Sequence, residues 1–180
     1  PWLGGQGPPV VIGVGRLSPQ KDFPNLLHAF AALRREMDAR LIILGEGSRR
    51  SELEGLARRL GIDGAVDMPG FVRNPAAHVR RANVFALSSA WEGFGNVLVE
   101  ALAVGTPVVS TDCRSGPSEI LDSGRYGDLV PVGDSAALAR ALAHNLRGPR
   151  RHIEPQAIDR FRAEHCAEQY LECMGMLSPA

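Results

Sequence analysis

The chain has 180 residues and a mass of 19.3 kDa, with 44% hydrophobic and 22% charged residues. These proportions exclude a disordered or fibrous protein and predict one globular domain over residues 1–180. Lys and Arg together number 20, as do Asp and Glu, and this balance argues against a nucleic-acid-binding protein. The three cysteines lack metal-ligand spacing, and no stretch approaches the roughly 20 apolar residues of a membrane span. We therefore expect a soluble domain in a reducing compartment such as the cytoplasm.

Strands and helices alternate from the start of the chain. Continuous apolar runs rich in β-branched residues predict strands buried on both faces over residues 9–15 and 40–44. Apolar residues at helical spacing predict a helix that begins at Pro24, where proline fits the first turn. The turn Gly45-Glu46-Gly47 ends the second strand, and Ser48 is the expected N-cap of the next helix.

The remaining elements follow the same alternation. We expect further strands at 66–68, 83–87, 107–110 and 127–130 and helices at 75–82, 96–103 and 116–121, with Asp134 capping a last core helix. Six strands in this order predict a Rossmann-like, doubly wound parallel sheet with helices on both faces and a core over about residues 9–147. Beyond Gly148-Pro149, an amphipathic tail helix is predicted over about residues 155–177, which must pack on another surface.

The first loop of the predicted sheet carries two cations. In an open parallel sheet, ligands bind beyond the carboxyl ends of the strands, and Arg16 and Lys21 lie in the loop that follows the first strand. Both can donate charge-assisted hydrogen bonds to a diphosphate. The same loop nearly matches the dinucleotide fingerprint GxGxxG, with Ser18 in the third glycine place, and Glu46 could accept from a ribose. A NAD-type dehydrogenase domain is therefore an alternative.

The segment between Glu92 and Glu100 is the second candidate. Glu92 lies in a glycine-flanked loop and Glu100 in an otherwise apolar helix, where an unpaired buried carboxylate would need a partner. Gly93 and Gly95 leave backbone amides accessible at a helix N-terminus, which favours anionic oxygens. Eight residues span about 12 Å of helix, comparable with the distance between the sugar and the ribose of a nucleotide sugar.

These motifs resemble a known family. Glu92 to Glu100 is similar to the E-x7-E motif of retaining GT-B glycosyltransferases, and Gly15-Arg16-Leu17 with Lys21 resembles their diphosphate-binding loop. The resemblance covers roughly residues 10–175, including Ser88-Ser89 and the run that begins at Gly105. It implies the C-terminal, donor-binding half of a glycosyltransferase of family 4.

The resemblance also implies residue roles. Arg16 and Lys21 would hold the diphosphate, Glu100 the ribose, and Glu92 the transferred sugar, so that Glu92, Arg16 and Lys21 form the catalytic set. The implied donor-binding residues are Gly15, Arg16, Lys21, Gly45, Phe71, Val72, Glu92, Gly93, Phe94, Gly95, Asn96, Val97 and Glu100. Among them, Gly45, Phe71 and Val72 would face the base.

The implied function is transfer of a hexose-type sugar from a nucleoside diphosphate, with UDP favoured, to an acceptor hydroxyl. No metal is implied, because Arg and Lys supply the charge. The N-terminal acceptor domain would be absent, with Pro1 at an interdomain cut, so the chain alone is expected to bind donor without transferring sugar. Its expected partners are a nucleotide sugar, the missing domain and a second copy through the tail helix. The full enzyme is expected in the cytoplasm or peripherally on the inner face of the membrane. A sugar-nucleotide epimerase domain remains an alternative to the transferase.

Overall fold

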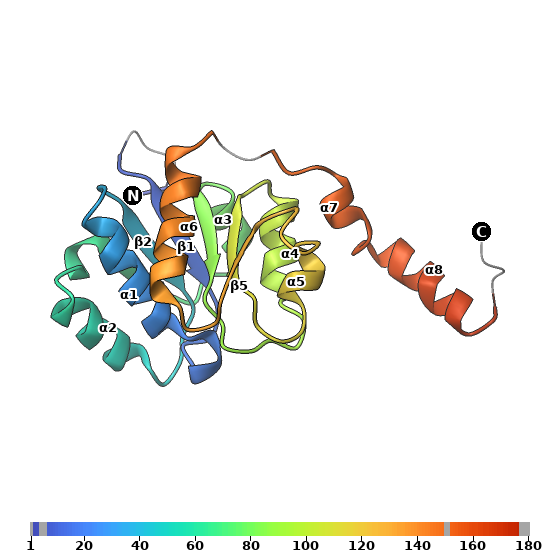
Figure 1. Ribbon diagram of the computed structural model, residues 1–180. Helices are drawn as coiled ribbons and strands as arrows, with labels where there is room; N and C mark the ends of the chain where they lie inside the picture. The colour runs from blue at the N-terminus through green and yellow to red at the C-terminus, as the bar shows by residue number, and fades with distance from the viewer. Residues whose placement is uncertain (1, 4–6, 150–151, 177–180) are drawn as a thin grey trace.

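The computed structural model describes residues 2–3, 7–149 and 152–176, so Pro1 and Leu177 of the sequence predictions lie outside the described residues. Its centre is one sheet of six strands (Figure 1), namely β1 Val10–Val14, β2 Arg40–Leu44, β3 Val66–Gly70, β4 Val84–Leu87, β5 Val108–Thr111 and β6 Asp128–Val130. The strand order is β3-β2-β1-β4-β5-β6, and every neighbouring pair is parallel. The predicted doubly wound parallel sheet is confirmed.

Helices cover both faces of the sheet (Figure 1). One face carries α1 Phe23–Arg34, α2 Arg50–Arg59 and α6 Ser135–Arg147, and the other carries α3 Pro75–Val79, α4 Asn96–Ala103, α5 Pro117–Ile120 and α7 Gln156–Asp159. Two short 3-10 helices, η1 Pro19–Lys21 and η2 Asp63–Ala65, lie in the connections. Within β1, Val11 packs into the first layer and Ile12 into the second, because successive strand side chains point to opposite faces.

Some predicted boundaries hold and others shift. Asp134 caps α6 as expected, since its side chain accepts from the Ala137 amide at 2.8 Å. The N-cap of α2 is Arg49 rather than Ser48, and its amide donates to the Leu17 carbonyl of the neighbouring loop. This hydrogen bond to the loop after β1 fixes the turn that precedes α2. β3 runs through Pro69 and Gly70, beyond the predicted end, which an edge strand tolerates because one side lacks ladder bonds.

The tail is two helices rather than one. α7 packs on the sheet domain, with Ala157 fully buried, while α8 Ala163–Cys173 has no buried residue. Between them the chain is extended at Arg162, with φ −70° and ψ 145°, which ends the continuous helix that the apolar spacing predicted. Figure 1 shows α8 projecting away from the sheet. None of the helices in the described ranges is long and apolar enough to cross a membrane.

Candidate functional site: a cleft and an ion pair at the carboxyl edge

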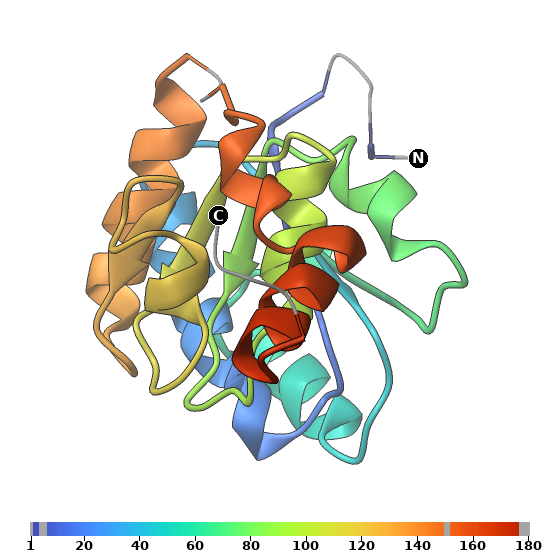
Figure 2. The same cartoon turned by 90° about the vertical axis from the view of Figure 1, so that its right-hand side faces the viewer.

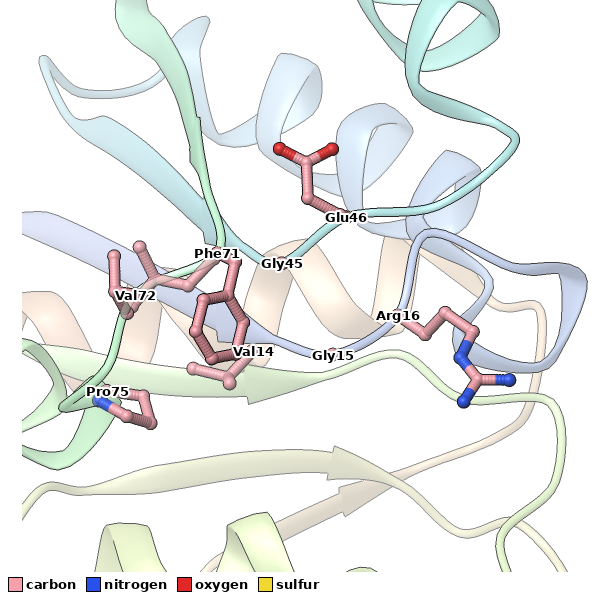
Figure 3. A pocket seen from close by; sticks show the side chains of 9 residues that line it. Val14, Gly15, Arg16, Gly45, Glu46, Phe71, Val72 and Pro75 are labelled. Carbon is pink, nitrogen blue, oxygen red and sulfur yellow. The ribbon is translucent and has the colours of Figure 1, made fainter.

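A cleft of about 400 Å³ opens at the carboxyl ends of β1 and β2 (Figure 3). Its lining residues are Val14, Gly15, Arg16, Leu44, Gly45, Glu46, Phe71, Val72 and Pro75. Five of the residues predicted to bind the donor are among them, contributed by three separate loops. The parallel sheet brings these loops together, because every strand ends at the same edge.

Close backbone contacts shape the floor of the cleft. The Gly15 amide donates to the Leu44 carbonyl at 2.9 Å, and the Gly45 amide donates to the Gly70 carbonyl at 2.9 Å. Gly45 has φ +138°, and a Cβ placed there would lie 2.0 Å from the Gly15 carbonyl oxygen. Any larger residue at position 45 would therefore push the two loops apart. The glycine is needed for the cleft to keep its shape.

The two ends of the cleft differ in chemistry. Figure 3 shows Phe71, Val72, Val14 and Pro75 gathered at one end and the Arg16 side chain at the other. Phe71 is 77% exposed, so the apolar surface of its ring is available to a planar group. The Arg16 side chain is also exposed and can pair with an anion. The cleft suits a molecule with a flat base at one end and phosphates at the other.

Glu46 also lines this cleft, where the dinucleotide alternative expected an acid that accepts from a ribose. Its carboxylate lies 3.1 Å from the Arg50 guanidinium, one turn along at the start of α2. The loop after β1 runs into the 3-10 helix η1 rather than directly into α1. Ser18, in the third glycine place of GxGxxG, therefore precedes a 3-10 turn and not the first turn of α1.

Lys21 and Glu92 form an ion pair beside the cleft. The Lys21 Nζ lies 2.6 Å from Glu92 Oε1, and their side chains are 14% and 6% exposed. The sequence predictions placed Lys21 with Arg16 on a diphosphate and Glu92 on a sugar. The structure separates the two cations, with Arg16 lining the cleft and Lys21 held by Glu92. A ligand that recruits Lys21 must therefore share it with Glu92 or take it from Glu92.

Two serines at the end of β4 position this pair. The Ser89 hydroxyl donates to Glu92 Oε1 at 2.6 Å, and the Ser88 hydroxyl donates to the Lys21 carbonyl at 2.8 Å. Gln20 adds a longer contact of 3.4 Å to Glu92 Oε2. Sequence reasoning noted Ser88-Ser89 without giving them a role. The available signal was two consecutive small polar residues at the end of a fully apolar strand.

The helix after Glu92 does not bury Glu100. α4 begins at Asn96, with the buried Gly95 as its N-cap at φ +93°. Leu98 and Ala101 of α4 are buried, whereas Glu100 is exposed, as the 3.6-residue period requires. The argument that Glu100 needs a partner to offset burial is therefore wrong. An exposed carboxylate is available to a ligand but is not forced to bind one.

Cys113 lies beside Glu92 but remains a thiol. Burial raises the pKa of the Cys113 thiol, and the Glu92 charge raises it further. A protonated thiol is a poor nucleophile. Within the described ranges, no group of three or more His, Cys, Asp or Glu side chains is placed to hold a metal ion. The expectation that ligand binding needs no metal stays a prediction.

Comparison with known proteins identifies the family. The sequence model of the family described as "Glycosyl transferases group 1" matches residues 3–160. The chain belongs to this glycosyltransferase family. It is 41% identical over 143 residues to a phosphatidyl-myo-inositol mannosyltransferase of Mycobacterium leprae, covering 76% of this chain and 37% of that protein. The dehydrogenase alternative has no support from these comparisons.

A second relative and two solved structures agree. The chain is 37% identical over 132 residues to N-acetylgalactosamine-N,N'-diacetylbacillosaminyl-diphospho-undecaprenol 4-alpha-N-acetylgalactosaminyltransferase of Campylobacter jejuni, covering 73% of this chain and 36% of that protein. The apo lipopolysaccharide outer core galactosyltransferase WaaB superposes with a TM-score of 0.84 at 29% identity, over 96% of this chain and 50% of that one. Anabaena Alr3699/HepE in complex with UDP and glucose gives 0.83 at 27% identity, over 94% and 49%.

Together, the family match and these structures identify a C-terminal domain of a GT-B glycosyltransferase. The chain spans well under half the length of the two curated relatives and about half of the two solved chains. The motifs that suggested the family in the sequence are thus consistent with both the fold and the family match. The roles of individual residues are a separate question.

The ion pair predicts a coupling between Lys21 and Glu92. Because both side chains are mostly buried, Lys21→Met or Glu92→Gln leaves a charge without its partner, whereas the double variant removes both charges. We expect each single change to lower the free energy of unfolding by about 1–3 kcal/mol, and the double change to cost at least about 0.5 kcal/mol less than their sum. Urea denaturation measures the free energy of unfolding of the unmodified chain, the two single variants and the double variant.

The exposed pair Arg125 and Glu154, 3.1 Å apart, is the matched control. Its double-mutant cycle with Arg125→Met and Glu154→Gln should give a coupling near zero, because exposed pairs are screened by solvent. Strictly additive effects for Lys21 and Glu92 would show that the pair is not formed in solution.

Proposed function

We propose that this chain is the nucleotide-sugar-binding half of a retaining GT-B glycosyltransferase of family 4. The full enzyme transfers a hexose-type sugar from a UDP-sugar to an acceptor hydroxyl. The observation that carries this proposal is the cleft, which has an exposed aromatic ring at one end and Arg16 at the other. It is supported by the similarity to Alr3699/HepE, which was solved with UDP and glucose.

Residue roles follow from the two ends of the cleft. The base lies against Phe71, Val72 and Gly45, and the diphosphate reaches Arg16 and the amide of Gly15. The exposed carboxylate of Glu100 accepts from the ribose hydroxyls. The sugar then extends toward Glu92 and the segment Gly93 to Val97, where the amides of Phe94, Gly95 and Asn96 face it.

Lys21 has a double role in this proposal. During transfer, the bond between the anomeric carbon and the β-phosphate oxygen breaks, and negative charge collects on the leaving diphosphate. A cation placed in advance stabilises that charge most effectively. Held by Glu92 at 2.6 Å in the unliganded site, the Lys21 ammonium is already desolvated and lies between the sugar-binding acid and the phosphates.

The acceptor is proposed to bind to a second domain. Each donor-binding residue above is on this chain, and holding an acceptor hydroxyl near the anomeric carbon accounts for about 7–11 kcal/mol of barrier lowering. The chain alone therefore binds donor but does not transfer sugar. The names of the two curated relatives contain a polyprenol and a phosphatidylinositol, which supports a full enzyme that works at a membrane surface. We propose that it works from the cytoplasm at the inner face.

Ligand titration tests the donor site. We expect UDP to bind in about the micromolar to millimolar range, with no change when EDTA is added and no binding of NAD. Arg16→Ala should weaken UDP binding by roughly ten- to a hundredfold but change uridine binding little, because the lost bonds go to phosphate. Isothermal titration calorimetry measures each ligand.

Arg35→Ala is the control, because Arg35 is an exposed arginine that ends α1 far from the cleft. Equal losses for UDP and uridine in Arg16→Ala would remove Arg16 from the phosphate site. Binding of NAD in place of UDP would reject the function.

Substitutions of Glu92 and Glu100 should affect the binding of different ligands. Glu100→Gln should weaken UDP and UDP-sugar alike, because both contain the ribose. Glu92→Gln should weaken only the UDP-sugar, and UDP should bind at least as well as before because Lys21 is released from its partner. Titration of both variants with both ligands measures the contrast. A loss of UDP affinity in Glu92→Gln equal to the loss of UDP-sugar affinity would contradict the division of roles.

Self-association through the tail is also proposed. α8 and the residues after it expose large apolar side chains, at Tyr170, Met174 and Met176. These side chains would be removed from water if the tails of two copies packed against each other. Light scattering should therefore show a mass that rises with concentration, and Tyr170→Asp with Met174→Glu should restore the monomer. If the unmodified chain keeps the mass of a monomer at every concentration, it does not self-associate through the tail.

A further inference from the structure

The segment after α6 returns to the loop that follows Glu92. Figure 2 shows α7 lying over the helical layer that contains α4, and Ala157 of α7 is fully buried in that layer. The partly buried side chains packed on the same cluster include Phe94 and Phe161. Phe94 lies in the loop proposed to contact the sugar, so the tail and the donor site meet here.

The contact is an aromatic pair. The ring centroids of Phe94 and Phe161 are 5.6 Å apart and the ring planes make an angle of 72°, an edge-to-face arrangement. This geometry is attractive because the positive edge of one ring meets the negative face of the other. It fixes the Phe94 side chain on the side of the loop that faces the tail.

Phe161 is itself held in place by its neighbour Arg160. The Arg160 guanidinium donates to the carbonyls of Glu119 and Ile120, the second at 3.0 Å, and stacks 4.7 Å from the centroid of the Phe161 ring. Both carbonyls lie at the end of α5. Arg160 therefore binds the tail to the end of α5, one residue before Phe161, which contacts Phe94.

The start of α5 supports the same loop from another side. Gly116 precedes α5, and a Cβ placed on it would lie 1.7 Å from the Phe94 carbonyl oxygen. The backbone of Phe94 thus rests directly on Gly116 while its ring meets Phe161. Gly93 and Gly95 flank Phe94 and give the loop backbone unusual freedom. A loop of this composition depends on outside contacts to hold its amides in one arrangement.

We propose that Phe161 is a positioning residue for sugar recognition, acting through Phe94 on the amides of the loop between Glu92 and Val97. The inference rests on the proposed function. Phe161 lies one residue beyond the region matched by the family model, so the family match assigns it no part in the site. The base and diphosphate subsites do not involve Phe94, so Phe161 affects the sugar and not the rest of the donor.

The test compares ligands that differ only in the sugar. UDP and the tightest binder among UDP-glucose, UDP-galactose and UDP-N-acetylglucosamine are titrated into the 180-residue chain and into Phe161→Ala. The UDP-sugar should bind about three- to tenfold more weakly to the variant, the change that an aromatic pair of this kind supports, and UDP should bind as before. Phe161→Tyr keeps the ring and should restore the UDP-sugar affinity.

Hydrogen exchange gives a second readout that needs no ligand. Amides of residues 93–97 should exchange faster in Phe161→Ala, while those of β1 stay protected. Glu168→Ala changes an exposed side chain of the same tail, outside the apolar residues proposed for self-association, and is the control, with no effect on either readout.

The outcomes separate this inference from the proposed function. If UDP binds and Phe161→Ala leaves the UDP-sugar affinity and the exchange of residues 93–97 unchanged, the inference is wrong and the donor site stands. Equal weakening of UDP and UDP-sugar would also overturn it, because the effect would be a general loss of structure. If the unmodified chain binds no UDP, the proposed function fails and the inference fails with it.

Discussion

The parallel register of the sheet is the constraint on which the site depends. In β1 and β2, Val10 pairs with Arg40 and Val14 with Leu44, so both strands end at the same level. A parallel sheet must return the chain through a helix each time, and every return places the next loop at the same edge. The cleft is therefore built from segments far apart in sequence, without any one of them having to form a pocket alone.

The ion pair between Lys21 and Glu92 adds a second constraint at that edge. Two opposite charges that are mostly removed from water stabilise the fold only if they are paired and hydrogen-bonded. The Ser89 hydroxyl supplies one such bond to Glu92, and the Ser88 hydroxyl fixes the backbone of Lys21. In the proposed function, a diphosphate that binds nearby competes with Glu92 for the Lys21 ammonium group. Without a ligand, the pair keeps each of the two charges from being buried alone. In the proposed function, the strength of this pair also limits how much free energy a diphosphate gains by binding to Lys21.

Sequence patterns predicted the parts of the structure that depend on local composition. The central strands β1 and β4 are apolar runs, and the Asp134 cap follows from its place before an amphipathic helix. Contacts between distant segments were beyond this reasoning. Nothing in the sequence near Ser48 indicates that the Leu17 carbonyl accepts a hydrogen bond from the Arg49 amide at the start of α2. The apolar spacing of the tail does not reveal the extended residue Arg162. For the site, residue types at strand ends predicted roles for Arg16, Lys21 and Glu92, and those roles stay predictions. The sequence did not reveal that Lys21 and Glu92 form an ion pair.

The loop after Glu92 shows why such contacts matter for a binding site. A glycine-flanked loop loses more backbone freedom on ordering than most segments, so amides that must point at a ligand need support from elsewhere in the chain. Gly116 supports the Phe94 backbone and Phe161 supports its ring. Neither residue lies near Glu92 in sequence, and neither has a polar or charged side chain. A search for polar or charged residues would therefore overlook both, although in our proposal they hold the amides that contact the sugar.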